Sequence, residues 1–184
     1  YRFQENDFNL KKCKACRILF VDPQPDAATI KSMYGKDYFT SDYRCGHNAA
    51  TAFEVEQSEL PPWFSRVRLP EKARILEIGC ATGYTLSAFK NRGYDCRGIE
   101  ISEEAAQYAR KEFSLRVETA DIGSAALEEK SFDLIYLLDV FEHLADPAGA
   151  LRRIARWLRP SGTAVFVIPT QTNTRSGPLF FLGG

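Results

Sequence analysis

The sequence has no excess of charge of either sign and no long apolar run. Its 24 basic and 24 acidic side chains cancel, so we expect neither a nucleic acid nor a membrane as its partner. No apolar stretch approaches the roughly 20 residues that span a bilayer. The first residues also lack the apolar core of a secretion signal. We therefore expect a cytoplasmic protein.

Cysteine and histidine are both sparse. The five cysteines are an odd number, which fits a reducing compartment better than a disulfide framework. The two histidines are His47 and His143. Histidine is the side chain that titrates near neutral pH without a shift, so a general base has few candidates here.

What is present is organised around residues 74–84. The apolar run from Arg74 to Ile78 has an acid near its end and predicts a buried strand. A loop of small residues follows, from Gly79 to Gly83, and helical spacing then predicts a helix over 83–92. Strand, glycine-rich turn and helix form the front of a nucleotide-binding α/β unit. Glycines let a ligand approach the backbone, and the helix start offers free N–H groups.

Beyond this unit, strand and helix patterns alternate with short loops. We expect strands over 94–99, 114–118, 132–138 and 163–168, a helix capped by Ser102, a short helix over 121–127, and a helix that Asp146 caps and Pro160-Ser161-Gly162 ends. Strand 132–138 is nearly all apolar, as a strand buried on both faces is. This alternation predicts a parallel sheet with right-handed crossovers, hence an α/β fold.

The last predicted helix carries an apolar row and a basic row. Its apolar residues Leu151, Ile154, Ala155 and Leu158 are expected to face the core, and Arg152, Arg153, Arg156 and Arg159 to face outward. The arginine row has two interpretations, a nucleic-acid patch or a solvated face. The zero net charge favours the solvated face.

The glycine spacing separates two classes of nucleotide site. A dinucleotide fingerprint has glycines at the first, third and sixth positions. Counted from Gly79, the third position is Ala81 and the sixth is Tyr84, which argues against an NAD(P)-dependent oxidoreductase, the main alternative. The Gly-Lys-Ser/Thr of a phosphate-binding loop is also absent.

The pattern that remains is acid-x-Gly-x-x-x-Gly, from Glu77 to Gly83. It resembles motif I of the class I S-adenosylmethionine-dependent methyltransferases, which usually has a further glycine where Ala81 stands. The resemblance implies a Rossmann-like, doubly wound parallel sheet of strand order 3-2-1-4-5. It also implies that residues of this loop bind S-adenosylmethionine, namely Glu77, Gly79, Cys80, Ala81 and Gly83.

Three more loops at strand ends are expected to hold the cofactor. Glu100, 23 residues after Glu77, ends the second strand, where a carboxylate can accept bonds from both ribose hydroxyls. The resemblance gives the other contacts: Ile101 to the adenine face, Asp121 to the adenine amine, Ile122 beside it, and Asp139 in the loop at the methionine end. Asp121 has a second interpretation as a helix N-cap, and one residue can do both.

The loop after the fourth strand indicates the substrate class. It reads Asp139-Val140-Phe141-Glu142-His143-Leu144, without the Asp/Asn-Pro-Pro-aromatic of amino-methylating DNA enzymes or the Pro-Cys of cytosine-C5 enzymes. It looks like the small-molecule branch of the family, which includes quinone-biosynthesis enzymes of type 11/23. We expect in-line methyl transfer to a small molecule, with His143 as the catalytic base or, alternatively, as a structural residue of the loop.

The N-terminal part has a different texture. Cys13 and Cys16 form a C-x-x-C, half of a tetrahedral zinc site. Members of the resembled family often carry a zinc-ribbon-like segment here, so we expect zinc in the full-length protein. Cys45 and His47 would complete a Cys3His zinc site, but the Cys-x-His spacing is tight for two ligands of one metal. The aromatic residues Tyr34, Tyr38, Phe39 and Tyr43, with Met33, are expected to pack on the main domain; the alternative is that Tyr34 or Tyr38 covers the cofactor pocket.

These patterns divide the chain into three parts. Residues 1–47 form the N-terminal appendage, 48–72 a helical linker, and 73–184 the cofactor-binding core. Only 16 residues follow Ile168, too few for the C-terminal hairpin of the resembled family, so we expect a fragment with five strands and an open sheet edge. A non-catalytic binding module is the third functional alternative, and a homodimer is possible.

Overall fold

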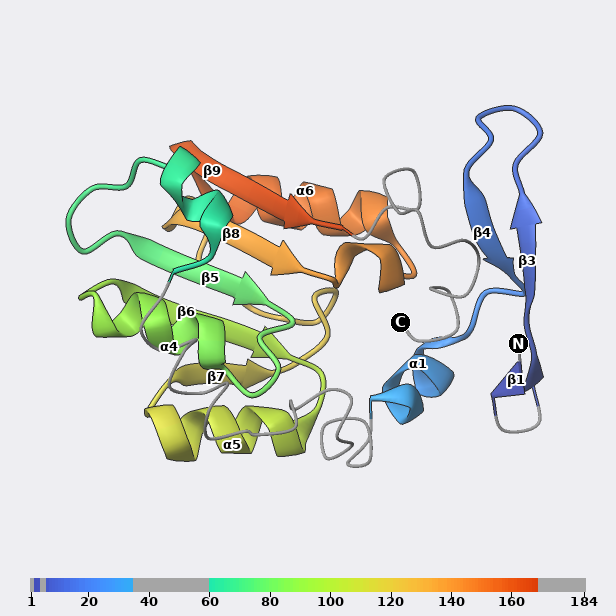
Figure 1. The fold of residues 1–184 in the computed structure, drawn as a ribbon, viewed down its shortest axis with the longest axis horizontal. Helices are drawn as coiled ribbons and strands as arrows, with labels where there is room; N and C mark the ends of the chain where they lie inside the picture. Colours follow the sequence, from blue (N-terminus) through green and yellow to red (C-terminus); the bar gives the residue numbers. More distant parts are fainter. Residues whose placement is uncertain (1, 4–5, 35–59, 169–184) are drawn as a thin grey trace.

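A computed structural model describes residues 2–3, 6–34 and 60–168 of the chain (Figure 1). A five-stranded parallel sheet lies at its centre, in the order β7-β6-β5-β8-β9. Its strands are β5 (Arg74–Ile78), β6 (Asp95–Glu100), β7 (Arg116–Thr119), β8 (Phe132–Leu138) and β9 (Leu158–Val167). This is the predicted order 3-2-1-4-5, and it confirms the Rossmann-like α/β fold.

Helices cover both faces of the sheet. Three lie on one face: α4 (Tyr84–Asn91), α5 (Glu103–Phe113) and the 3-10 helix η1 (Pro62–Arg66). The opposite face is covered by α6 (Pro147–Trp157). The two-layer cover explains why β8 is buried from Phe132 to Leu137, as its apolar sequence predicts.

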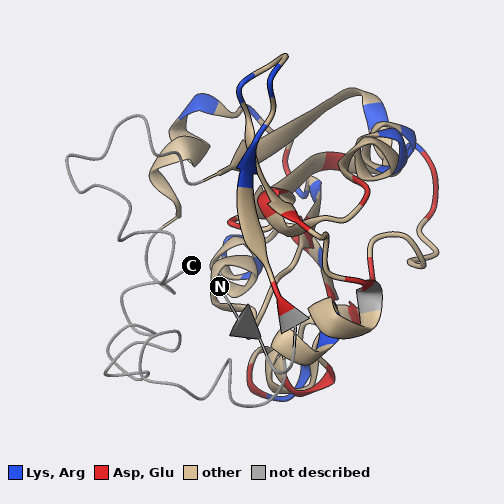
Figure 2. Cartoon of the chain, turned by 90° about the vertical axis from the view of Figure 1, so that its right-hand side faces the viewer, with Lys and Arg blue, Asp and Glu red and all other residues tan. Residues whose placement is uncertain are grey.

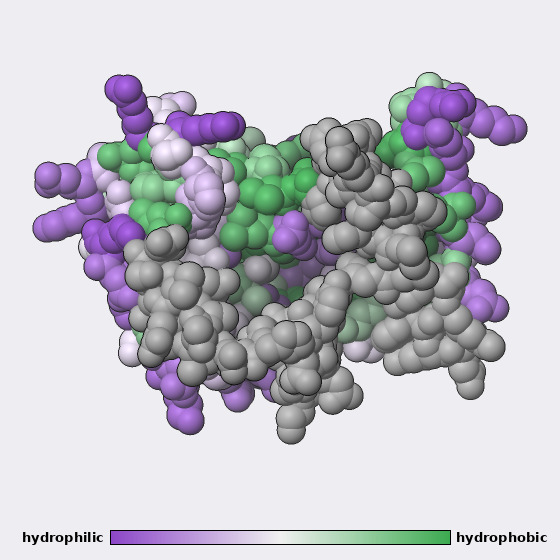
Figure 3. Space-filling view, viewed as in Figure 1, coloured by the Kyte–Doolittle hydropathy of each residue, from purple (hydrophilic) through white to green (hydrophobic). Residues whose placement is uncertain are grey.

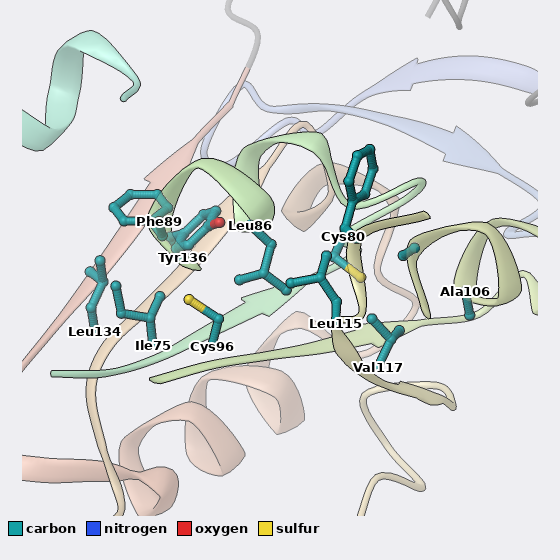
Figure 4. Close-up of a cluster of buried hydrophobic side chains, with 12 residues drawn as sticks. Ile75, Cys80, Leu86, Phe89, Cys96, Ala106, Leu115, Val117, Leu134 and Tyr136 are labelled. Carbon is teal, nitrogen blue, oxygen red and sulfur yellow. The ribbon is translucent and has the colours of Figure 1, made fainter. Parts of the chain in front are cut away.

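The core under α4 is built from aliphatic and aromatic side chains (Figure 4). Phe89 of α4 and Tyr136 of β8 are both fully buried, with ring centroids 5.4 Å apart. Trp63 of η1 packs on Tyr136 at 5.3 Å. The linker residues nearest the core therefore pack against the sheet, while residues 48–59 lie outside the described part of the chain.

The helix α6 differs from its prediction in both its face and its end. Its buried residues are Ala150, Ile154 and Trp157, whereas Leu151 is 44% exposed and Ala155 is exposed. The chain turns extended at Leu158, so this residue and Pro160-Ser161-Gly162 belong to β9 rather than to the helix or its stop. The large indole of Trp157 packs in the core cluster between α6 and the sheet. It therefore determines which face of the helix is turned inward.

The arginine row is also divided. Arg159 Nη1 lies 2.7 Å from a carboxylate oxygen of Asp133, which is 8% exposed. Arg159 therefore pairs with a buried acid across β8 and β9 instead of facing solvent. Arg152 and Arg156 are exposed, as predicted.

The short helix expected over 121–127 is absent from this described stretch. Asp121 instead closes a turn, because its Oδ1 accepts the N–H of Gly123 at 2.6 Å and its carbonyl accepts the N–H of Ala125 at 3.0 Å. A side chain that bonds its own backbone two residues on favours a turn over a helix. Neither helix nor strand is formed by residues 125–128 that follow.

The N-terminal part forms small separate elements. Two short hairpins come first, β1 (Arg2–Phe3) with β2 (Asn6–Asp7), and β3 (Asn9–Lys12) with β4 (Leu19–Asp22). The helix α1 (Ala27–Met33) follows. The β3–β4 hairpin and α1 lie beyond the carboxyl ends of the sheet strands (Figure 1). The hairpin exposes an apolar surface beneath its hydrophilic tip (Figure 3), made of Leu10, Ile18, Leu19, Phe20 and Val21. None of the described helices could cross a membrane.

Candidate active site at the carboxyl edge of the sheet

The predicted loops meet at one edge of the sheet because all five strands are parallel. The backbone N–H groups of Gly79 and Cys80 both bond the carbonyl of Ile99, at 2.8 and 3.2 Å. The N–H of Ala120 bonds the carbonyl of Glu100 at 2.9 Å. The loops after β5, β6 and β7 are thus joined by backbone hydrogen bonds. Acidic residues stand on loops of this edge, and basic residues on the β3–β4 hairpin (Figure 2).

The loop from Gly79 to Gly83 turns through left-handed backbone conformations. Gly79, Ala81 and Gly83 have φ of 72°, 47° and 86°. A side chain in this region costs about 1–2 kcal/mol, which explains why glycine is usual at the position of Ala81. The N–H of Gly83 bonds the carbonyl of Cys80 at 2.8 Å and closes the loop before α4.

The two glycines are also needed for space. A Cβ at Gly79 would overlap Val140 Cγ2, in the loop after β8. A Cβ at Gly83 would lie 2.8 Å from Ala109 Cβ and 2.6 Å from Leu115 Cδ1. Gly79 therefore allows the loops after β5 and β8 to touch, and Gly83 allows α4 to approach α5.

Glu100 is a buried acid of this edge that is fixed by two hydrogen bonds. Its side chain is buried, and each carboxylate oxygen accepts one backbone N–H at 2.8 Å, from Ala81 and from Ser102. Burial raises the pKa of Glu100, and these two N–H bonds oppose the increase. Each carboxylate oxygen has a second lone pair, so the group fits a vicinal diol while it still holds the loop.

Glu77 has a partner that the sequence analysis missed. Tyr136 lies opposite Glu77 in the β5–β8 register, and its hydroxyl donates to Glu77 Oε2 at 2.9 Å. Both residues are buried. Burial, and next the negative charge of Glu77, raise the pKa of Tyr136 far above its usual range. The signal in the sequence was a tyrosine inside an aliphatic strand, since a buried phenol needs a hydrogen-bond partner.

Cys80 and Cys96 are packing residues next to these acids. A Cβ at Gly98 would lie 2.6 Å from Cys80 Sγ, so Gly98 makes room for this thiol. Burial and the charges of Glu77 and Glu100 raise the pKa of Cys80 well above its usual value. Burial, with the charge of Glu77, raises the pKa of Cys96 to about 12. Both thiols therefore stay protonated at neutral pH.

The remaining predicted cofactor residues lie on neighbouring loops. Ile122 is buried in the core cluster on the α6 face, and Ile101 is half-buried. Asp121 and Asp139 are exposed at their strand ends. Tyr84, at the sixth position of the loop, points to α5 instead: its ring centroid lies 5.2 Å from that of Phe113 and its hydroxyl 3.2 Å from that of Tyr108.

His143 lies in η2 (Phe141–His143), on the loop after β8. Its side chain is 42% exposed, and its Nε2 lies 3.7 Å from Glu142 Oε1. Burial raises the pKa of Glu142, and the charge of Asp139 adds to the increase, while that of His143 opposes it. Phe141 packs on Phe166 of β9 at 5.1 Å. The loop thus presents an imidazole and two acids at the edge where the cofactor loops end.

Cys13 and Cys16 lie together in the turn of the β3–β4 hairpin. The N–H of Arg17 bonds the Cys13 carbonyl at 3.0 Å, and that of Cys13 bonds the Ile18 carbonyl at 2.8 Å. Backbone N–H groups, first of Cys16 and then of Ala15, lower the pKa of Cys13. No three potential metal ligands gather among the residues that the structure describes. Cys45 and His47 lie outside those residues, so the zinc site stays a prediction.

Comparisons with known sequences agree with this geometry. The chain is 34% identical over 102 residues to the ubiquinone biosynthesis O-methyltransferase of Alkalilimnicola ehrlichii, covering 52% of this chain and 41% of the relative. It is 33% identical over 107 residues to the protein of the same name from Pseudomonas fluorescens, covering 55% and 46%. The chain therefore spans about half the length of these curated relatives.

Solved structures support the same fold. A TehB-like S-adenosylmethionine-dependent methyltransferase from Corynebacterium glutamicum superposes with a TM-score of 0.53 at 25% identity, covering 65% of this chain and 70% of that one. The PH0226 protein from Pyrococcus horikoshii superposes with a TM-score of 0.59 at 20% identity, covering 71% and 66%, and shows the fold alone. Residues 51–178 match the family described as "Methyltransferase domain". The chain belongs to this family, as a class I domain of the S-adenosylmethionine-dependent methyltransferases.

Proposed function

We propose that this chain transfers the methyl group of S-adenosylmethionine to a hydroxyl oxygen of a small molecule. The observation that carries the proposal is the buried carboxylate of Glu100, held between the N–H groups of Ala81 and Ser102. A buried acid fixed against a glycine-rich loop suits a ribose diol. The names of the O-methyltransferase relatives support oxygen as the acceptor atom.

The other cofactor contacts follow the same edge. We assign Gly79, Cys80, Ala81 and Gly83 to the cofactor loop and Glu77 to its support through Tyr136. Ile101 would contact the adenine ring, Ile122, whose side chain is buried in the core, would offer its backbone, and the exposed carboxylate of Asp121 would bind the adenine amine. Asp139 would lie at the methionine end. The acids of this edge suit a cofactor that carries a positive charge.

When bound, S-adenosylmethionine would supply a methyl group on a cationic sulfur. The acceptor oxygen would attack the methyl carbon in line with the carbon–sulfur bond, which breaks as the oxygen–carbon bond forms. The protein's own work is to bind, orient and accept a proton. We assign the proton to His143, whose imidazole is accessible and lies beside Glu142. The loop after β8, which carries His143, meets the cofactor loop where Val140 packs on Gly79.

Three further assignments belong to this proposal. We place the protein in the cytoplasm, which fits the free thiols of the four described cysteines. We expect zinc on Cys13 and Cys16 in the full-length protein, with the other ligands outside the described residues. A homodimer also stays a prediction.

Calorimetric titration with S-adenosylhomocysteine, with NADH in parallel, tests the cofactor assignment. We expect micromolar binding of S-adenosylhomocysteine only. Glu100→Ala should weaken it by about 1–3 kcal/mol, the scale for a lost charge-assisted hydrogen bond. Glu112→Ala is the matched control, since Glu112 is an exposed acid on α5. Equal affinity in wild type and Glu100→Ala would remove Glu100 from the site, and NADH binding alone would restore the oxidoreductase alternative.

A further inference from the structure

The helix α1 brings an aromatic residue of the N-terminal part to the carboxyl edge of the sheet. Asp26 caps the helix, with its Oδ1 accepting the N–H of Thr29 at 2.7 Å. The helix ends at Tyr34, whose N–H bonds the carbonyl of Lys31 at 3.3 Å. Figure 1 shows α1 beyond the strand ends, on the side of the sheet where the loop after β8 lies. A residue more than 100 positions before His143 thus reaches the same region.

Tyr34 and His143 form an aromatic pair. Their ring centroids are 6.2 Å apart and their planes meet at 71°. Rings at this angle meet edge to face, an arrangement that aromatic groups prefer. The side chain of Tyr34 is half-buried, and that of His143 is 42% exposed. The pair therefore keeps surface on which a ligand can lie.

The charges of the loop that carries His143 restrict the ligand. Residues 139–144 contain two acids, Asp139 and Glu142, and no lysine or arginine. An anionic acceptor would meet like charge there. A cationic acceptor would be repelled by the sulfonium of the cofactor that it must approach, and a protonated amine has no lone pair for the attack. An uncharged planar molecule with a hydroxyl suits both the rings and the charges.

We propose that Tyr34 is an acceptor-contacting residue, which with His143 forms the aromatic wall that selects an uncharged, hydroxylated ring. This inference rests on the proposed function and deepens it. Tyr34 holds the flat face of the acceptor, and its neighbour His143 takes the hydroxyl proton as the oxygen–methyl bond forms. The N-terminal part then belongs to the acceptor site and sets specificity.

The test uses catechol as a small probe acceptor and measures the S-adenosylhomocysteine formed from S-adenosylmethionine. Two analogues isolate the two features of the inference. The compound 3,4-dihydroxybenzoate adds a negative charge to the same ring, and cis-1,2-cyclohexanediol keeps the hydroxyls without the ring. The variants are Tyr34→Ala, Tyr34→Phe, and Tyr108→Ala as the control, since Tyr108 is an exposed tyrosine that contacts α4 and α5 residues.

We expect wild type to methylate catechol in preference to both analogues. Tyr34→Ala should raise KM for catechol about tenfold, the scale of one lost aromatic contact, with unchanged affinity for S-adenosylhomocysteine. Tyr34→Phe, which keeps the ring, and Tyr108→Ala should stay near wild type. Thermal unfolding of each variant shows that the fold is retained.

Two results would overturn the inference. One is a wild-type KM for catechol in a folded Tyr34→Ala variant. The other is a wild-type protein that binds S-adenosylhomocysteine and neither binds nor methylates catechol, or prefers either analogue. Both leave the cofactor half of the proposed function intact. Loss of S-adenosylhomocysteine binding in wild type is a different outcome, because it refutes the proposed function itself.

Discussion

The two halves of the candidate site are built in different ways. The cofactor half, around Glu100 and the loop 79–83, has a buried carboxylate and is joined by hydrogen bonds to backbone N–H groups. The acceptor half, around His143 and Tyr34, is partly exposed and joined by ring contacts between distant segments. Backbone bonds and burial fix a geometry, whereas exposed rings tolerate exchange. We infer that the first half serves one constant ligand and that the second is the part that can change with substrate.

Substitution of Gly79 should have the largest effect, because Gly79 lies where the loop of the cofactor half contacts Val140 in the loop of the acceptor half. In Gly79→Ala the new methyl overlaps Val140 and the residue must keep φ of 72°. We expect a loss of about 3 kcal/mol or more in the free energy of unfolding, from strain and overpacking together. Urea denaturation measures this loss.

Gly93→Ala is the matched control for that substitution. Gly93 has φ of 88° and no atom within 4 Å of an added Cβ, so strain acts alone and the loss should be about 1 kcal/mol. Equal losses in the two variants would mean that the contact between Gly79 and Val140 is not a constraint.

His143→Ala should separate the halves by function. We expect turnover of catechol to fall about 100-fold, the lower range for loss of a general base, because no other described imidazole exists to take the proton. The affinity for S-adenosylhomocysteine should not change. Steady-state kinetics and calorimetry on the same preparation give both values, and unchanged turnover would reduce His143 to a structural residue of η2.

Tyr136→Phe should have the smallest effect and act on the cofactor half alone. It removes the hydroxyl that donates to the buried Glu77, which should cost about 1–2 kcal/mol of stability. Tyr84→Phe is the control, since the Tyr84 hydroxyl meets that of Tyr108 in an exposed pair and its loss should cost less than about 0.5 kcal/mol. Thermal unfolding compares them, and a smaller loss for Tyr136→Phe than for Tyr84→Phe would contradict the role of the buried pair.

The sequence predicted the strands and loops that carry the cofactor half because their signals are local. The glycines of the loop, the apolar strand before it and the position of Glu100 all lie within one βαβ unit of 74–100. Periodicity and short loops then determine the sheet order with few alternatives. The site assignments of this half remain proposals, but their location at one sheet edge was predictable.

The features that were missed depend on contacts between distant residues. The partner of Glu77 follows from the register of β5 on β8, which no local pattern encodes. The helix expected after Asp121 is replaced by a turn through one side-chain hydrogen bond. The buried face of α6 is determined by Trp157, which packs in the core cluster on that side of the sheet. The contact of Tyr34 with His143 joins segments that are far apart in the sequence.

The cysteines differ in exposure and in pKa, and this difference can be used to follow conformational changes of the protein. Among the four cysteines that the structure describes, Cys80 and Cys96 are buried thiols of raised pKa, whereas Cys16 is exposed and Cys13 has a lowered pKa. Maleimide reagents attack thiolates that solvent can reach. In a zinc-free Cys45→Ser variant at neutral pH, such a reagent would mark Cys13 and Cys16 of the β3–β4 hairpin and spare Cys80 of the cofactor loop, so a dye placed there can report how the N-terminal part responds to each ligand.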